Sequence, residues 1–205
     1  MPNSHATVAV FDFGNVLLDW NPRHLYRKLF TDAERMEWFL REVCNTAWIL
    51  ETDRGQPFAE AVAQRIAVHP DLAAEIRAFD ERWLETILGP LAESVALLET
   101  LRRNGVPVYG ITNFSAEKFA VACDVFSFLT AFDGIIVSGR ERLLKPDPAI
   151  FRLLLDRHGL TAEDCLFIDD VPANVEGARA VGMHGHRFLH PGGLAEELRR
   201  HRFPV

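Results

Sequence analysis

The chain has 205 residues and a formal net charge of −7, with 48% of its residues hydrophobic and 25% charged. These values fit a globular domain carrying at most an insertion, and they exclude a chain dominated by disorder. The acidic balance argues against nucleic acid as a partner, because nucleic acid requires a basic surface. The apolar run Val8–Phe11 is too short for a membrane span or a signal segment. Three widely spaced cysteines form no zinc or redox motif, so we expect a reducing, cytoplasmic location.

The N-terminal part of the chain predicts one buried strand followed by a long helical segment. The strand, Val8–Phe11, ends at Asp12, and Gly14 suits a sharp turn after it. Helical spacing of apolar residues then recurs at residues 24–30, 36–43, 58–68 and 72–88. No convincing strand pattern interrupts this stretch, which therefore predicts an all-helical insertion.

Strand and helix patterns alternate after Pro90. The expected strands are residues 106–111, 134–137, 165–168 and 184–188, and the expected helices are residues 93–104, 115–123, 148–158 and 173–181. This alternation is typical of an α/β fold with a doubly wound, Rossmann-like parallel sheet. We predict that residues 1–18 and 90–205 form this catalytic core and that residues 19–89 form a helical cap.

Polar side chains follow the predicted strands, where an open parallel sheet binds its ligands. In chain order they are Asp12, Thr112, Asn113, Lys145, Asp169 and Asp170. Carboxylates placed together repel one another unless a cation joins them, and Mg²⁺ suits oxygen ligands that it shares with a substrate. The ion and the lysine ammonium together would hold a phosphate. Asp12 would then attack it and form an aspartyl intermediate.

Four segments that carry these residues resemble the ordered motifs of the haloacid dehalogenase-like hydrolase superfamily. They are residues 11–17 (FDFGNVL), 111–113 (ITN), 145–151 (KPDPAIF) and 167–170 (FIDD). Each motif is weak alone, but four motifs in the family's order are a strong signal. The resemblance covers almost the whole chain, and the helical insertion matches a cap placed after the first motif.

The resemblance implies a role for each of these residues. Asp12 would be the nucleophile, and Thr112 would bind the transferred group with Asn113 beside it. Lys145 would neutralise charge on the nucleophile and on the phosphoryl group. In the cap, Arg23 is a candidate contact for the substrate. We therefore expect a small phosphorylated molecule as the partner.

The resemblance also implies a Mg²⁺ site and reveals one departure from the family pattern. Asp12, Asp169, Asp170 and the backbone carbonyl of Gly14 would reach the ion. Phosphatases of the superfamily usually carry a second aspartate, the proton donor, at the position of Gly14. General acid–base help is worth roughly 10²–10⁴-fold. Either the reaction is slow, or the proton comes from elsewhere, or the leaving group is good, as in a sugar 1-phosphate or an acyl phosphate.

The sequence offers few substitutes for the missing acid. Asp19, near the entrance to the cap, is a weak candidate for that role. Other cap residues that could face the substrate are Trp20, Arg23, Trp48, Asp53 and Arg54.

Three functions remain open from the sequence. The leading hypothesis is a magnesium-dependent hydrolase of small-molecule phosphate monoesters, sugar phosphates among them, acting through a phospho-aspartyl intermediate on Asp12. The alternative is a metal-independent 2-haloacid dehalogenase, which uses the same aspartate but needs no carboxylate pair such as Asp169 and Asp170. The third is a non-catalytic ligand-binding member of the superfamily.

Overall fold

A five-stranded parallel sheet lies at the centre of the structure, a computed structural model that describes residues 5–205. Its strand order is β5-β4-β1-β6-β7, and every neighbouring pair is parallel. The strands are β1 (Val8–Phe11), β4 (Val108–Thr112), β5 (Gly134–Val137), β6 (Cys165–Asp169) and β7 (His184–Arg187). The predicted doubly wound α/β sheet is therefore confirmed.

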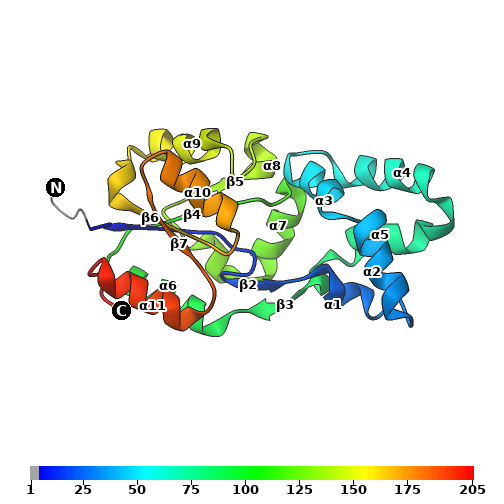
Figure 1. Cartoon of the computed structure of the whole chain (residues 1–205), viewed down its shortest axis with the longest axis horizontal. Coiled ribbons are helices and arrows are strands. Elements are labelled where there is room, and N and C mark those ends of the chain that lie inside the picture. Colours follow the sequence, from blue (N-terminus) through cyan, green and yellow to red (C-terminus); the bar gives the residue numbers. More distant parts are fainter. Residues whose placement is uncertain (1–4) are drawn as a thin grey trace.

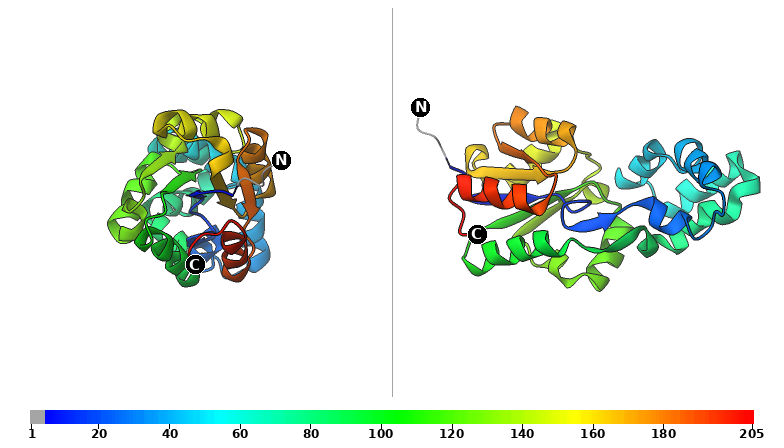
Figure 2. Two further views of the ribbon diagram at one scale, coloured as in Figure 1. Left: turned by 90° about the vertical axis from the view of Figure 1, so that its left-hand side faces the viewer. Right: turned by 60° about the horizontal axis from the view of Figure 1, so that its bottom comes forward.

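Helices cover both faces of this sheet (Figure 1; Figure 2). One face carries α6 (Ala92–Arg103), α7 (Ala116–Val125) and α11 (Pro191–Arg200), and the other carries α9 (Pro148–His158) and α10 (Pro172–Ala180). The short helix α8 (Ser138–Glu141) follows β5. Strand β1 is buried on both sides, because Ala9 and Phe11 pack in one core and Val8 and Val10 in the other. A strand buried on both faces reads as a continuous apolar run, which is how β1 appears in the sequence.

A second group of helices lies beyond the carboxyl ends of the strands, at the right of Figure 1. We call residues 22–86 the helical lobe. It contains α1 (Pro22–Tyr26), α2 (Ala33–Glu42), α3 (Thr46–Asp53), α4 (Phe58–Val68) and α5 (Ala73–Glu81). Its core is aromatic: the rings of Tyr26 and Phe39 lie 4.8 Å apart, and Phe58 stacks on Phe79 at 6.0 Å. None of the helices within residues 5–205 has the length and apolarity needed to cross a membrane.

An antiparallel ribbon, β2 (Leu18–Trp20) paired with β3 (Ile87–Pro90), joins the helical lobe to the sheet. The ribbon lies close to both predicted limits of the cap, but the division of the chain into these two parts stays a prediction. The sequence predicted neither strand, and it predicted a helix over residues 72–88 where α5 already ends at Glu81. Both differences have the same cause. Strands β2 and β3 pair with each other although the whole helical lobe separates them in the sequence, so local patterns do not reveal either strand.

The loop after β1 depends on a close approach between Phe13 and strand β4. A Cβ atom added at Gly110 would lie 2.7 Å from Cζ of Phe13, so only glycine lets the ring rest on the strand. Phe13 is fully buried and directly follows Asp12. We expect Gly110→Ala to lower the free energy of unfolding by about 1–3 kcal/mol, as overpacking does in other cores.

Urea unfolding monitored by circular dichroism would measure this effect. Gly14→Ala is the matched control, because a Cβ there meets no heavy atom within 4 Å among the described residues. Its unfolding free energy should stay within about 0.5–1 kcal/mol of the wild-type value. Equal midpoints for the two variants would contradict the packing argument.

Candidate active site

A buried cluster of opposite charges lies at the carboxyl ends of β1 and β6. Asp12 directly follows β1, Asp169 is the last residue of β6, and Lys145 comes from the loop between α8 and α9. The Lys145 Nζ lies 2.8 Å from Oδ1 of Asp12 and 2.6 Å from Oδ2 of Asp169. It also donates a hydrogen bond of 3.0 Å to the carbonyl oxygen of Ile111. The side chains of Lys145 and Asp169 are only 1% and 0% exposed, so these charges have little water to solvate them.

The cluster holds more negative than positive charge. Burial raises the pKa of Asp12 to about 7; the ammonium of Lys145 opposes this shift, and the charge of Asp169 adds to it. Burial disfavours the charged form of Lys145, but the two carboxylates outweigh burial and raise its pKa. Burial also raises the pKa of Asp170, and the charge of Asp169 raises it further. A second cation would therefore stabilise the cluster.

The donor atoms suit such a cation. Asp12, Asp169 and Asp170 each offer a carboxylate oxygen, and these oxygens lie within 4.8 Å of one another. An all-oxygen, anionic donor set is the kind that binds Mg²⁺. Gly14 lies in the wall of the same cavity as Asp12 and Asp170. The predicted contact between its carbonyl oxygen and the ion stays a prediction.

Two asparagines hold the charged side chains in place. The Nδ2 of Asn174, on α10, donates to both carboxylate oxygens of Asp169 at 3.1 and 3.0 Å. The amide of Asn113 bonds to the backbone of Lys145, accepting from its N–H at 2.8 Å and donating to its carbonyl at 3.1 Å. Partners of this kind fix the orientation of the groups that act on a ligand. Asn113 thus positions Lys145 as well as lying in the cavity wall.

The structure places the other two predicted substrate residues differently. Thr112 ends strand β4 with 1% of its surface exposed, and it lies outside the described wall of the cavity. Arg23 does lie in that wall, but its Nε and Nη2 bond to the carboxylate of Glu37 at 2.6 and 2.5 Å. Its charge is therefore already paired in this structure. Substrate binding by Thr112 and Arg23 stays a prediction.

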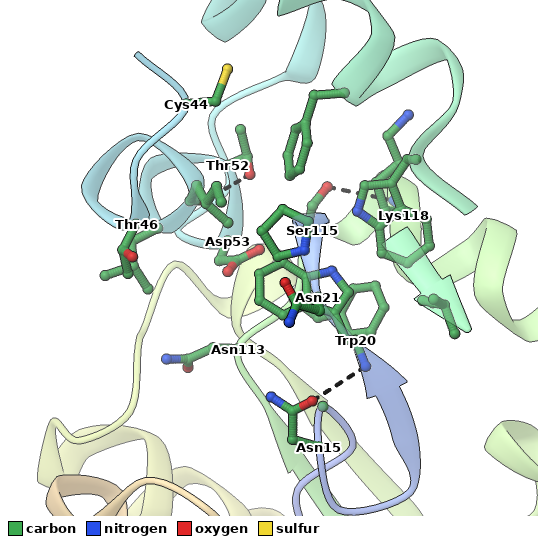
Figure 3. Close-up of a pocket in the computed structure, with 18 of the residues that line it drawn as sticks. Asn15, Trp20, Asn21, Cys44, Thr46, Thr52, Asp53, Asn113, Ser115 and Lys118 are labelled. Atoms are coloured by element: carbon green, nitrogen blue, oxygen red, sulfur yellow. Dashed lines mark hydrogen bonds between the residues drawn. The ribbon is translucent and has the colours of Figure 1, made fainter. Parts of the chain in front are cut away.

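A cavity of about 630 Å³ extends from the charged cluster into the helical lobe (Figure 3). Pockets for small organic ligands typically measure about 300–1,000 Å³. Asp12, Lys145 and Asp170 line it together with residues of the lobe. The large apolar side chains in its wall are Leu18, Trp20, Leu40, Ile49, Leu50, Phe58, Phe79, Trp83, Ile87 and Phe114. Lys118, also in the wall, pairs with Asp80.

Asp53, another residue in this wall, belongs to helix α3, which the sequence did not predict. Asp53 is the last residue of α3, and burial raises the pKa of its carboxyl to about 7. The signal for α3 was Asn45, whose side chain accepts a hydrogen bond from the N–H of Trp48 and caps the helix. Asp19, by contrast, bonds to Nε2 of His24 at 3.0 Å and lies outside the described wall.

Comparisons with known proteins relate the chain to a family of hydrolases. A family model described as haloacid dehalogenase-like hydrolase matches residues 6–182. The sesquiterpene phosphatase astK of Aspergillus oryzae is 29% identical over 94% of each chain. An enzyme of the same family from Bacteroides thetaiotaomicron, solved with magnesium and inorganic phosphate, superposes with a TM-score of 0.67 at 18% identity, over 88% of this chain and 93% of that one. The L-2-haloacid dehalogenase of Xanthobacter autotrophicus reaches a TM-score of 0.64 at 18% identity, over 98% and 85%.

The buried ammonium of Lys145 leads to a prediction about stability and pH. In Lys145→Met, two buried carboxylates lose their partner, and breaking a buried pair costs about 3–5 kcal/mol. The loss should be larger at pH 8 than at pH 5. At the lower pH, Asp12, whose pKa is already raised, takes up a proton and loses its charge.

Urea unfolding in EDTA at the two pH values would measure the loss. Lys28→Met is the control, because Lys28 pairs with Glu85 at 2.8 Å on the surface, where such pairs are worth about 0–1 kcal/mol. Equal losses of unfolding free energy in the two variants, or a loss independent of pH, would show that the buried pairing contributes no more to stability than the surface pair.

Proposed function

The chain belongs to the haloacid dehalogenase-like hydrolases, and from this membership we propose that it is a Mg²⁺-dependent phosphatase of small organic phosphate monoesters. The observation that carries the proposal is the placement of Asp12. Its carboxylate is paired with Lys145, shares a cation-binding donor set with Asp169 and Asp170, and faces a ligand-sized cavity.

In the proposed reaction, an Asp12 carboxylate oxygen attacks the phosphorus atom. The bond between phosphorus and the leaving-group oxygen breaks, and a water molecule later hydrolyses the aspartyl phosphate. Lys145 favours the ionised form of Asp12 against the effect of burial, and it neutralises charge on the phosphoryl oxygens. When bound, Mg²⁺ supplies further positive charge to those oxygens. The hydroxyl of Thr112 and the amide of Asn113 would bind the same group.

The dehalogenase alternative fits this site less well. A 2-haloacid carries its own carboxylate, and it would meet Asp12, Asp169 and Asp170 with one ammonium to offset them. Like charges at this distance repel strongly in a buried site. The structural likeness to a dehalogenase is at 18% identity and concerns the fold alone. The retained carboxylates favour a phosphate held through a cation.

We further propose that the substrate carries an apolar organic group. The sequence left sugar phosphates open as substrates, and their hydroxyl groups need hydrogen-bonding partners. The wall of the cavity is instead rich in aromatic and aliphatic side chains, and charged pairs such as Arg23–Glu37 and Lys118–Asp80 satisfy one another. The full-length relative named as a sesquiterpene phosphatase supports the same choice.

Hydrolysis of p-nitrophenyl phosphate tests the reaction. We expect the wild-type protein to release nitrophenol with Mg²⁺ and to lose at least about 99% of this activity in EDTA or as Asp12→Asn. Covalent catalysis by this carboxylate cannot proceed when its nucleophilic oxygen is replaced. Retained turnover in Asp12→Asn would refute the proposal. Halide release from 2-chloropropionate in EDTA would instead establish the dehalogenase.

A series of n-alkyl phosphates tests the substrate class, because the leaving group stays constant while the buried chain grows. Each buried methylene is worth about 0.8 kcal/mol, so kcat/KM should rise about two- to fourfold per methylene until the cavity is filled. Glucose 1-phosphate and glucose 6-phosphate are the polar comparison. If either sugar phosphate has a kcat/KM equal to or above that of octyl phosphate, the apolar assignment is wrong.

A further inference from the structure

The proposed reaction leaves one requirement unmet, which is a proton for the leaving group. Gly14 supplies no side chain at the position where a carboxyl would be expected. Besides Asp12 and Asp170, the described wall of the cavity contains two carboxyl groups, those of Glu37 and Asp53. Glu37 accepts both hydrogen bonds of Arg23 and is held ionised by them. Asp53 has no ion pair among the described residues.

We propose that Asp53, delivered from the helical lobe at the end of α3, is the general acid that protonates the leaving-group oxygen. This inference rests on the proposed phosphatase reaction and identifies its missing catalytic residue. Figure 3 shows Asp53 between Thr52, deeper in the lobe, and Asn113, at the end of the sheet. Asp12 and Asp53 line the same cavity, and the charge of Lys145, which pairs with Asp12, also acts on the Asp53 carboxyl.

The backbone of Asp53 is tied directly to the catalytic side of the sheet. Its carbonyl accepts a hydrogen bond of 2.6 Å from Oγ of Ser138, and the same Oγ accepts one of 2.8 Å from the N–H of Phe114. Phe114 follows Asn113 in the loop after β4. Ser138 therefore links the end of α3 to the segment that also carries Thr112 and Asn113.

Two glycines allow the backbone after α3 to approach the backbone at the start of α8 closely. Gly55, two residues after Asp53, has a φ of +104°, and a Cβ there would lie 2.9 Å from the carbonyl oxygen of Gly139. A Cβ at Gly139 would lie 2.6 Å from the backbone nitrogen of Ala116. The chain after α3 thus packs backbone to backbone against the start of α8. These contacts fix the position of the backbone that carries Asp53.

The charge state of Asp53 suits a proton donor. Burial raises its pKa to about 7, against the opposing effects of the Ser115 N–H and the Lys145 charge. A carboxyl with a pKa near the working pH is protonated often enough to donate and acidic enough to do so readily. The resting enzyme would therefore hold the proton that the reaction consumes.

Bonds and protons balance over the whole cycle. An oxygen of Asp12 forms a bond to phosphorus, and the electron pair of the breaking P–O bond goes to the leaving-group oxygen. That oxygen takes the proton of the Asp53 carboxyl and departs as an alcohol, leaving Asp53 as a carboxylate. The water that then attacks phosphorus gives one proton back to Asp53. Phosphate leaves, and Asp12 and Asp53 return to their starting states.

The leaving group distinguishes an acid catalyst from a structural residue. Nitrophenolate departs without a proton, whereas an alkoxide does not. For Asp53→Asn with Mg²⁺, the rate of the first turnover should fall about 10²–10⁴-fold with octyl phosphate and less than about tenfold with p-nitrophenyl phosphate. Rapid-quench measurements of alcohol and nitrophenol release would give both rates. Glu51→Gln, exposed on the same helix, is the matched control and should change neither rate.

Gly14 offers an independent rescue. A Cβ at this position meets no heavy atom within 4 Å among the described residues, and Gly14 lies in the cavity wall. In Gly14→Asp combined with Asp53→Asn, a carboxyl returns near the leaving group. We expect the octyl phosphate rate to recover at least tenfold over Asp53→Asn alone, which a purely structural role of Asp53 would not produce.

The outcomes separate this inference from the proposed function. If Asp53→Asn slows both esters equally, or slows neither while the wild-type protein is active, Asp53 is not the acid and the phosphatase proposal still stands. If the folded wild-type protein hydrolyses neither ester with Mg²⁺, the phosphatase proposal falls and takes this inference with it. Unfolding midpoints within a few degrees of wild type would confirm that each variant is folded.

Discussion

The buried ammonium of Lys145 between Asp12 and Asp169 is the interaction on which the rest of the site depends. Charges this well buried are tolerated only when they are paired and hydrogen-bonded. The pairing requires the ends of β1 and β6 to lie side by side, and the register of Phe11 opposite Ile168 provides this. It also leaves an excess of negative charge, which is why a second cation belongs in the site. Lys145 therefore both pairs the ends of two neighbouring strands and sets the charge of the site.

Much of this arrangement could be predicted from the sequence because its signals are local. A strand buried on both faces appears as an apolar run, and a turn follows it. The bounds of β1, β5, α4 and α9 agree with those expected. Since parallel strands present their carboxyl ends at one edge, the residues that follow separate strands could be placed together from the sequence alone. Asp12, Lys145, Asp169 and Asp170 meet for that reason.

The parts that escaped prediction depend on contacts between distant segments. The ribbon of β2 and β3 is stabilised by pairing across the whole helical lobe, so neither strand has a strong local pattern. In α3 the buried residues are only Trp48 and Thr52, too few to give a clear helical period. The segment after Asp53 docks on Gly139 through a contact between two backbones, which no local sequence pattern indicates. The lining of the cavity, and with it the substrate class, follows from such contacts.

The division of roles between the two parts of the molecule has a consequence for selectivity. In the proposed reaction, the sheet supplies the nucleophile and the positive charge, while the helical lobe supplies the apolar wall and, with Asp53, the proton. An acid carried on the lobe is in position only while α3 is docked against Ser138. A substrate whose organic group fills the cavity packs against the lobe and favours that docked state, so its binding energy also places the acid. A small phosphate ester packs against less of the lobe, so less binding energy favours the docked position of α3. Placing the acid on the lobe rather than at Gly14 therefore makes recognition of the organic group part of catalysis.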